Sequence, residues 1–180
     1  MVRIVAGMVS LMALGVQMVS GQTYPSKPIR LFASTVGGGT DLEARLIAQG
    51  ITGPLGQPVI VDNRAGAVIA AELVSRAQPD GYSLLVVGSL LWIGPLLDSK
   101  TPYDPVRDFS PITLATTSPN VLVVYPLLPA NSVRELIALA RAKPGVLNYS
   151  SGATGASSHL AGELFRALAS VDIVRIPYKN

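Results

Sequence analysis

Apolar positions in the first half of the chain alternate between short strand-like runs and longer segments with helical spacing. Three runs rich in Val, Ile and Leu are typical of strands: residues 29–34, 58–62 and 82–87. Two segments have helical spacing, residues 41–51 and 68–77. In the first of these, Leu42, Leu46, Ile47 and Ile51 are expected to lie on one face of the helix. This βαβαβ order predicts a parallel sheet covered by helices on both faces.

The second half repeats this plan after a change of composition. Residues 101–109 are rich in Pro, Tyr and charged residues, which indicates a surface connection and a domain boundary. Beyond it we predict three strands and two helices: strands at residues 121–125, 146–150 and 173–176, and helices at 133–142 and 158–169. Ser132 and Glu135 have the spacing of a capping box at the start of one helix. We therefore expect a first α/β domain over residues 22–110 and a crossover with a partial second domain over 111–180.

The N-terminus has the features of a secretory signal peptide. Arg3 precedes an apolar run over residues 4–19, and Val19-Ser20-Gly21 resembles a cleavage site. The alternative is a membrane anchor, but the run is shorter than the ~20 apolar residues needed to span a bilayer. We expect residues 1–21 to be removed near Gly21 and the mature protein to be periplasmic.

Composition narrows the classes of function. The chain has 14 Lys and Arg against 11 Asp and Glu, without a basic cluster, which argues against a nucleic-acid partner. It has no cysteine and one histidine, so it offers neither a disulfide framework nor a thiolate or His-rich metal site. We expect no metal and no cofactor.

The segment of residues 36–43 joins the first predicted strand to the first predicted helix and contains three consecutive glycines. Glycines allow close approach of the backbone to a ligand, and Thr40 and Glu43 have capping-box spacing. A helix N-terminus at the carboxyl end of a parallel strand favours an anion. The alternative is a glycine-rich turn that only connects the two elements. A nucleotide site is less well supported, because neither a Gly-x-Gly-x-x-Gly nor a P-loop motif is present.

A second strand-to-helix segment, residues 150–159, is rich in Ser, Thr and Gly. It offers backbone donors and hydroxyls that can hold a carboxylate, or it simply caps the following helix. An enzyme alternative is a small hydrolase that uses Ser157 or Ser158 with His159, the one histidine. Adjacent residues on a helix point in different directions, and no Gly-x-Ser-x-Gly elbow occurs, so this alternative is weaker and we assign no catalytic residue.

Several short motifs, in order along the mature chain, resemble the periplasmic receptors of tripartite tricarboxylate transporters, also called Bug-type solute-binding proteins. The motifs are Tyr24-Pro25-Ser26-Lys27-Pro28, the Gly-Gly-Gly-Thr-Asp at 37–41, Leu55-Gly56-Gln57-Pro58-Val59, Asn63-Arg64, Pro79-Asp80-Gly81-Tyr82, Pro102-Tyr103-Asp104-Pro105 and Ser157-Ser158-His159-Leu160. The resemblance implies a type II periplasmic-binding-protein-like α/β fold with two Rossmann-like domains. It also implies a monomeric receptor that passes a small carboxylate (a dicarboxylate, tricarboxylate, amino acid or aromatic acid) to the membrane components of a transporter.

The resemblance also implies which residues hold the ligand. Carried over by position, they are Gly37, Gly38, Gly39, Thr40, Asp41, Ser89, Thr154, Gly155, Ala156, Ser157, Ser158 and His159. Asp41 is expected to position the helix rather than touch an anion, so Asp41→Asn should cost less affinity than Gly38→Val. Family members are longer than this chain, which implies that the second domain is incomplete here. A degenerate fragment that does not bind is therefore a further alternative.

Overall fold

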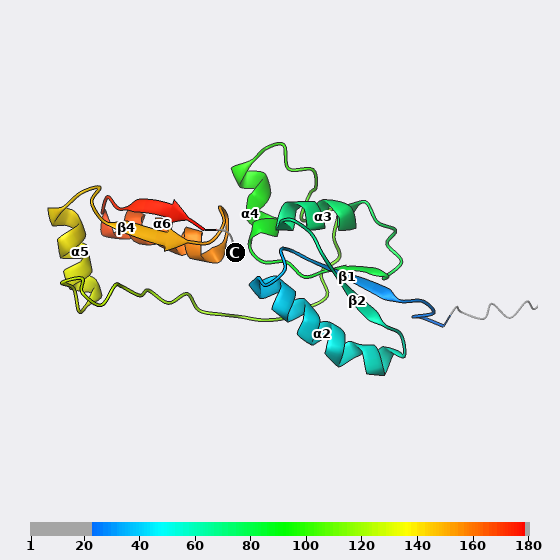
Figure 1. Ribbon diagram of the computed structural model, residues 1–180. Helices are drawn as coiled ribbons and strands as arrows, with labels where there is room; N and C mark the ends of the chain where they lie inside the picture. Colours follow the sequence, from blue (N-terminus) through cyan, green and yellow to red (C-terminus); the bar gives the residue numbers. More distant parts are fainter. Residues whose placement is uncertain (1–22, 179–180) are drawn as a thin grey trace, which may run out of the picture.

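The first sheet has three parallel strands, β1 (Ile29–Ala33), β2 (Val59–Asn63) and β3 (Ser83–Leu85), in the order β2-β1-β3. The computed structural model describes residues 23–178 (Figure 1). Three helices accompany this sheet: α2 (Gly39–Leu55), α3 (Ala67–Ser75) and α4 (Leu90–Leu97). The predicted βαβαβ order and the parallel strands are confirmed, with strand and helix ends shifted by a few residues.

Alternate residues of the strands pack into two cores on opposite faces of this sheet. On one face, Leu31 and Ala33 of β1 pack with Ala44 and Ala48 of α2. The other face has a separate core around Ala71 of α3, Leu91 of α4 and Tyr103. Leu84 belongs to the first core and its neighbour Leu85 to the second. Both faces are therefore covered, as the apolar third strand predicts.

The apolar face predicted for α2 is not the face that the structure buries. Leu42 is 61% exposed and Leu46 is 60% exposed, while the buried residues of this helix are Asp41, Ala44 and Ala48. The small side chains of Ala44 and Ala48 let the helix pack closely on Leu31 and Ala33 of β1. The buried residues 41, 44 and 48 lie on a different face of the helix from Leu42 and Leu46, so these two leucines point away from the sheet. Of the four residues predicted to share a face, Ile47 does pack against the core.

The second sheet has two parallel strands, β4 (Asn148–Ser151) and β5 (Val174–Pro177). Helices α5 (Val133–Ala142) and α6 (Ser157–Ala169) pack with it around Ala140, Ala169, Val171 and Ile173. Ser132 caps α5 as predicted, because its hydroxyl accepts from the Glu135 N–H at 3.2 Å. The Glu135 carboxylate accepts from the Asn131 N–H at 2.7 Å rather than from Ser132, so the reciprocal half of the capping box is displaced by one residue. The second α/β half is thus confirmed, and its apolar residues form a core of their own.

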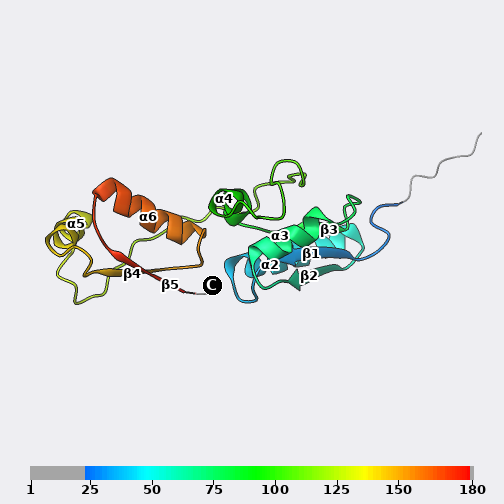
Figure 2. The ribbon, with the colours of Figure 1, turned by 90° about the horizontal axis from the view of Figure 1, so that it is seen from above.

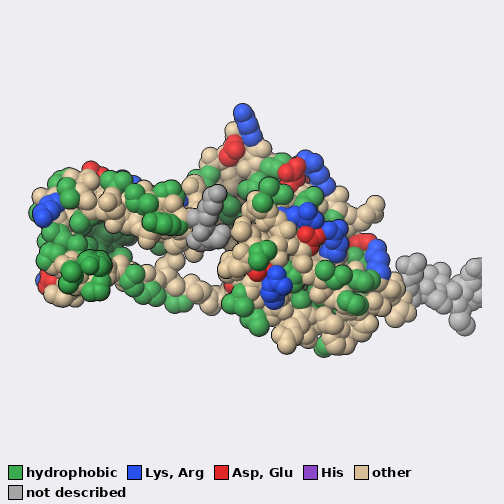
Figure 3. All heavy atoms as spheres, in the orientation of Figure 1, with side chains coloured by type: hydrophobic (Ala, Val, Ile, Leu, Met, Phe, Trp, Pro, Cys, Tyr) green, Lys and Arg blue, Asp and Glu red, His purple; other side chains and the backbone are tan. Residues whose placement is uncertain are grey.

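An extended segment, residues 111–127, connects the two halves along one side of the molecule (Figure 1). The predicted strand at 121–125 does not form, because no strand of the described chain lies beside it to supply ladder hydrogen bonds. Its apolar side chains are exposed, Val123 by 80%. Figure 3 shows hydrophobic side chains gathered over α5 at the end of this segment. There Leu122, Val124, Leu128 and Leu136 line an open surface hollow of about 380 Å³.

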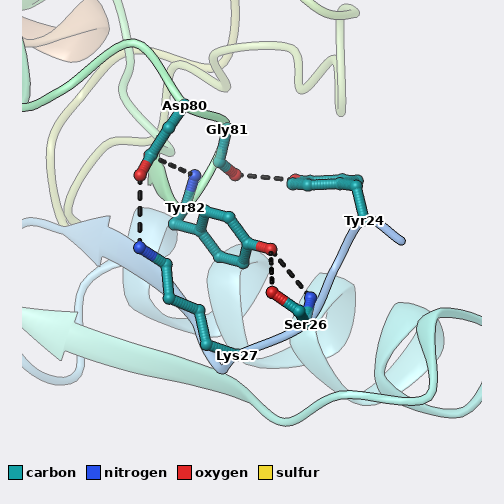
Figure 4. A network of polar contacts seen from close by, with 6 residues as sticks. All are labelled: Tyr24, Ser26, Lys27, Asp80, Gly81 and Tyr82. Carbon is teal, nitrogen blue, oxygen red and sulfur yellow. Dashed lines mark hydrogen bonds and ion pairs between the residues drawn. The ribbon is translucent and has the colours of Figure 1, made fainter. Parts of the chain in front are cut away.

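The start of the described chain is bound to the turn that precedes β3 (Figure 4). The Tyr24 hydroxyl donates to the Gly81 carbonyl at 2.7 Å, and the Ser26 N–H donates to the Tyr82 hydroxyl at 2.8 Å. Lys27 forms an ion pair with Asp80 at 3.2 Å. The Tyr82 N–H, more than Lys27, holds the pKa of the Asp80 carboxyl below its usual range. Two of the short motifs, residues 24–28 and 79–82, are therefore in direct contact in the folded chain.

One helix was missed from the sequence. Helix α4 contains Gly94 and Pro95, two residues that disfavour a helix interior, and lies in a stretch for which no element was predicted. It is held by the core around Leu91 and by the Tyr103 hydroxyl, which donates to the Leu90 carbonyl at 3.4 Å. Among residues 23–178, no helix has the length and apolar character to cross a membrane. The predicted signal peptide lies outside the described residues.

Candidate functional site

The first loop, residues 34–38, links β1 to α2 and is held in place by Asp41. One Asp41 oxygen accepts from the Gly37 N–H at 2.9 Å. The other accepts from the Asn63 side-chain amide at 3.0 Å and pairs with Arg45 at 2.9 Å. Asp41 is only 5% exposed, so this carboxylate is satisfied inside the protein. The Gly37 N–H, followed by the Arg45 guanidinium, holds the pKa of Asp41 below its usual range.

The predicted capping box at the start of α2 is wrong. The N-cap residue is Gly38, which has no side chain, and the Thr40 hydroxyl instead hydrogen-bonds the Ser34 hydroxyl at 2.5 Å. Glu43 accepts from the hydroxyl of Thr116 in the connecting segment at 2.7 Å. Gly37 has a φ of +82°, in the left-handed region where glycine is favoured. The loop geometry thus depends on Gly37 and Asp41 rather than on a capping hydroxyl.

The second loop, residues 152–156, links β4 to α6 with the same geometry. Gly155 has a φ of +85°, and its N–H donates to Nδ1 of His159 at 3.1 Å. Gly37 and Asp41 have this same four-residue spacing in the first loop. The Ala156 N–H donates to the Ala153 carbonyl at 3.0 Å, as the Gly38 N–H does to Thr35 at 3.2 Å. The two loops are therefore structurally equivalent, although their sequences share few identities.

The two helices that follow these loops both begin near the middle of the molecule. Figures 1 and 2, which are related by 90°, each show the first turns of α2 and α6 directed toward one another. Thr116 bonds Glu43 of α2, and Asn120 lies 3.5 Å from the Ser157 hydroxyl of α6. Four residues of extended chain span at most about 14 Å, so the connecting segment keeps these two helix starts close.

Ser89 contributes a direct contact between the halves. Its hydroxyl donates to the Gly155 carbonyl at 3.1 Å. Gly155 also packs against α4, since a Cβ added there would lie 2.4 Å from Leu90 and 3.1 Å from Leu97. The family resemblance implies that Ser89 helps to hold the ligand; in the structure its hydroxyl binds the second loop.

The first turns of α2 and α6 carry backbone donors with no partner. In residues 23–178, no acceptor is found for the N–H groups of Gly39, Thr40, Ser157, Ser158 and His159. The positive end of each helix dipole lies at these groups. The hydroxyls of Ser158 and Thr154 accept hydrogen bonds from the Gly152 N–H and from Arg175, so each can still donate. Such donors are suited to a carboxylate.

The twelve residues predicted for the site therefore divide into two groups. Seven have their polar groups or backbone occupied in holding the loops: Gly37, Gly38, Asp41, Ser89, Gly155, Ala156 and the His159 imidazole. Five can offer donors to a ligand: Gly39, Thr40, Thr154, Ser157 and Ser158. Sequence reasoning gave no role to two residues that hold the loops: Asn63, the last residue of β2, and Arg175 in β5 (Val174–Pro177), each more than 20 residues from the loop residue that it binds.

The geometry gives little support to a serine hydrolase. Nδ1 of His159 accepts from Gly155, and the Ser158 hydroxyl accepts from Gly152. Among the described residues, no hydrogen bond joins His159 to Ser157 or Ser158. A nucleophile and its base need such contact, so the pair is not arranged as a catalytic unit.

The chain matches one protein family along most of its length. Residues 43–180 match the model of the tripartite tricarboxylate transporter family receptor. Protein BugT of Bordetella pertussis is 39% identical over 90% of this chain and 51% of its own length. A protein from the tcbD-tcbE intergenic region of Pseudomonas sp. is 38% identical over 87% of this chain and 48% of its own. The chain thus spans about half the length of these relatives.

Solved structures give the same result. Rpa4515 of R. palustris, solved with adipate, has a TM-score of 0.80 and 37% identity over 87% of this chain and 54% of its own. MatC of Rhodopseudomonas palustris, solved with bound malate, has a TM-score of 0.71 and 29% identity over 86% of this chain and 54% of its own. The periplasmic binding protein BugD has a TM-score of 0.70 and 32% identity, over 87% and 54%. These likenesses confirm the periplasmic-binding-protein α/β fold, and the chain belongs to the tripartite tricarboxylate transporter receptor family.

Proposed function

We propose that this chain is a periplasmic solute-binding receptor that holds a small carboxylate between the first turns of α2 and α6. The observation that carries the proposal is the pair of equivalent loops, each followed by helix N–H groups without an acceptor in residues 23–178. The acid nearest to these donors, Asp41, is bound by three donors of its own. The first turn of α2 therefore keeps a net attraction for an anion.

A dicarboxylate fits this arrangement better than a monocarboxylate. Each loop presents one set of donors, so a ligand with a carboxylate at either end engages both. Charge-assisted hydrogen bonds contribute about 1.5–3 kcal/mol each, and a helix dipole adds about 0.3–1 kcal/mol at an exposed site. The relatives solved with adipate and with malate carry dicarboxylates, which supports this ligand class.

We further propose that the protein is exported to the periplasm and delivers its ligand to a membrane transporter. Residues 1–21 are proposed to be a signal peptide, residues 22–110 a first domain and residues 111–180 the crossover and part of a second. The periplasmic receptor, as a monomer, would pass its ligand to the membrane components of a tripartite transporter. N-terminal sequencing of the periplasmic fraction should find a start near Gln22. An intact Met1 in the membrane fraction would contradict export with cleavage.

Proline substitutions at the first helical positions test the binding site with little disturbance of the fold. Gly39 and Ser157 are the first residues of their helices, and the residues before them are extended, with ψ of 170° and 156°. Proline is favoured at such a position and removes only the N–H. Gly39→Pro and Ser157→Pro should each weaken adipate or malate binding by about tenfold or more, as measured by isothermal titration calorimetry.

Val133→Pro is the matched control, because Val133 is the first residue of α5 and also follows an extended residue. It should leave affinity unchanged. Adipamide, which has the shape of adipate without its charges, should not bind. Equal affinity in all three proline variants, or equal binding of the diamide, would contradict the proposed site.

A further inference from the structure

Arg175 of β5 holds the second loop through three separate contacts. Its Nε donates to the Ser151 hydroxyl at 2.8 Å, and Nη2 donates to the Gly152 carbonyl at 2.8 Å. Its Nη1 donates to the Thr154 hydroxyl at 3.1 Å. One planar guanidinium thus joins the end of β4 to two residues of the loop.

The first loop has a different residue in the corresponding place. The Asn63 side-chain amide donates to the Ser34 carbonyl at 2.8 Å and to Asp41. Ser34 and Gly152 are equivalent, since each directly follows the last residue of the first strand of its sheet. Asn63 pairs with Ala33 in the first sheet, and Pro177 occupies that register position opposite Ser151 in the second. Proline has no side-chain donor, and Arg175 reaches the loop from two residues earlier.

The charge of Arg175 has no acidic partner in the described chain. None of the ion pairs within residues 23–178 includes Arg175, whereas Arg45 beside the first loop is paired with Asp41. All three of its acceptors are neutral oxygens. A guanidinium in this position orders the loop and adds positive charge behind it.

We propose that Arg175 is the positioning residue of the second loop, the functional counterpart of Asn63 in the first. It acts through the loop: it fixes the Gly152 carbonyl and the Thr154 hydroxyl, and thereby the donors at the start of α6. The effect on ligand affinity rests on the proposed function, whereas the effect on loop order does not.

Amide hydrogen exchange, measured by NMR, tests the ordering directly. Arg175→Gln and Arg175→Lys should each raise the exchange rate of the Gly155 and Gly152 N–H groups by about tenfold, because neither replacement reproduces the guanidinium fork. The Gly37 N–H in the first loop should be unchanged. Arg134→Gln, which removes one charge from an exposed position on α5, is the control and should leave all three rates unchanged.

A rescue variant separates positioning from general stability. Pro177→Asn added to Arg175→Gln places an amide at the register position that Asn63 occupies in the first sheet. This double variant should recover protection at Gly152 and Gly155. Exchange at these groups that is the same in Arg175→Gln and Arg134→Gln would overturn the proposal, as would a double variant no better protected than the single one.

Calorimetry with adipate and malate then tests the link to binding. Arg175→Gln should weaken binding and the double variant should restore part of it. If even the unmodified chain fails to bind any dicarboxylate, the proposed function fails, and the exchange rates still decide the role of Arg175. If the unmodified chain binds and Arg175→Gln leaves affinity unchanged while the loop loosens, the claim that loop order sets affinity is contradicted.

Discussion

A side chain four residues after a left-handed glycine holds each loop. Asp41 accepts from the Gly37 N–H, and His159 accepts from the Gly155 N–H, at 2.9 Å and 3.1 Å. The same geometry is thus built with a carboxylate in one loop and an imidazole in the other. In both cases the acceptor satisfies a loop N–H and leaves the first helical N–H groups free.

Asp41→Asn should destabilise the protein more than its small change in size suggests. The Asp41 carboxylate accepts from three donors, whereas an asparagine turns one NH₂ group toward a donor. We expect the midpoint of thermal unfolding to fall by a few degrees. The expectation that Gly38→Val costs more ligand affinity than Asp41→Asn stays a prediction, and a Cβ at Gly38 would lie 3.2 Å from the Thr35 carbonyl, closer than ordinary contact. Asp172→Asn, at an exposed position in the other half, is the control.

The stability that the Asp41 carboxylate contributes should decrease at acidic pH. The pKa of Asp41 is lowered in the folded protein, chiefly by the Gly37 N–H. Its contribution should therefore be fully present above about pH 4, the ordinary aspartate range, and be lost as the pH falls through the lowered pKa. Urea titrations should show that the stability difference from Asp41→Asn is constant from neutral pH to about 4 and shrinks below it. A difference that grows on acidification would contradict the assignment.

His159→Asp should keep the second loop ordered, whereas His159→Ala should not. An aspartate at this position would reproduce the arrangement of Asp41 and Gly37, while alanine offers no acceptor to the Gly155 N–H. Protection of this N–H against exchange should fall only in the alanine variant. Equal loss in both variants would show that the two loops are not interchangeable in this way.

Sequence reasoning identified both loops but not how they are held. Glycines, hydroxyls and helix starts are visible as local patterns, and they placed the two segments correctly between strand and helix. Asn63 and Arg175 act from strands that pair with β1 and β4 only in the folded state. No local spacing reports such contacts. The capping box expected at Thr40 failed for a different, local reason: the helix begins one residue earlier, with Gly38 as its N-cap, and the Thr40 hydroxyl bonds Ser34.

At the scale of elements, α4 packs directly against the second loop at Gly155, where Leu90 and Leu97 leave no room for a side chain. Gly155→Ala should destabilise this contact, because it adds a left-handed alanine and brings a Cβ within 2.4 Å of Leu90. Gly145→Ala is a matched control: Gly145 has a φ of +71°, and its added Cβ would meet only Asp172 at 3.4 Å. Both variants should lose about 1–2 kcal/mol of stability from backbone strain. Gly155→Ala should lose more, as measured by urea unfolding.

The sequence predicted the order and type of the helices and strands correctly wherever the local hydrophobic pattern matched the tertiary packing. Both α/β halves were predicted because strand runs and helical spacing alternate regularly. The strand at 121–125 failed because a β-rich run needs a neighbouring strand, which the pattern does not provide. Helix α4 was missed because Gly94 and Pro95 disfavour it, and burial of Leu91 overrides that preference.

At the scale of the whole molecule, the connecting segment should be the most open part of the described chain. Residues 111–125 have no regular secondary structure and expose Val121 and Val123, while β1 is paired on both sides. Hydrogen exchange should be fastest in this segment and slow in both β1 and the core of α6. Slow exchange over residues 111–125 would contradict this prediction, because it would require hydrogen bonds for this segment that the structure does not show. The rest of the second half should exchange more slowly than this segment, because Ala140, Val171 and Ile173 form a buried core.

The central claim is that one dicarboxylate engages both loops. An NMR titration of the ¹⁵N-labelled chain with malate and adipate tests it most directly, because amide shifts report weak binding at individual residues. The account predicts shifts at Gly39 and Thr40 of α2 together with Ser157 and Ser158 of α6, with one common binding curve. Shifts at one loop alone, shifts centred on the surface hollow beside α5, or no shifts would contradict it.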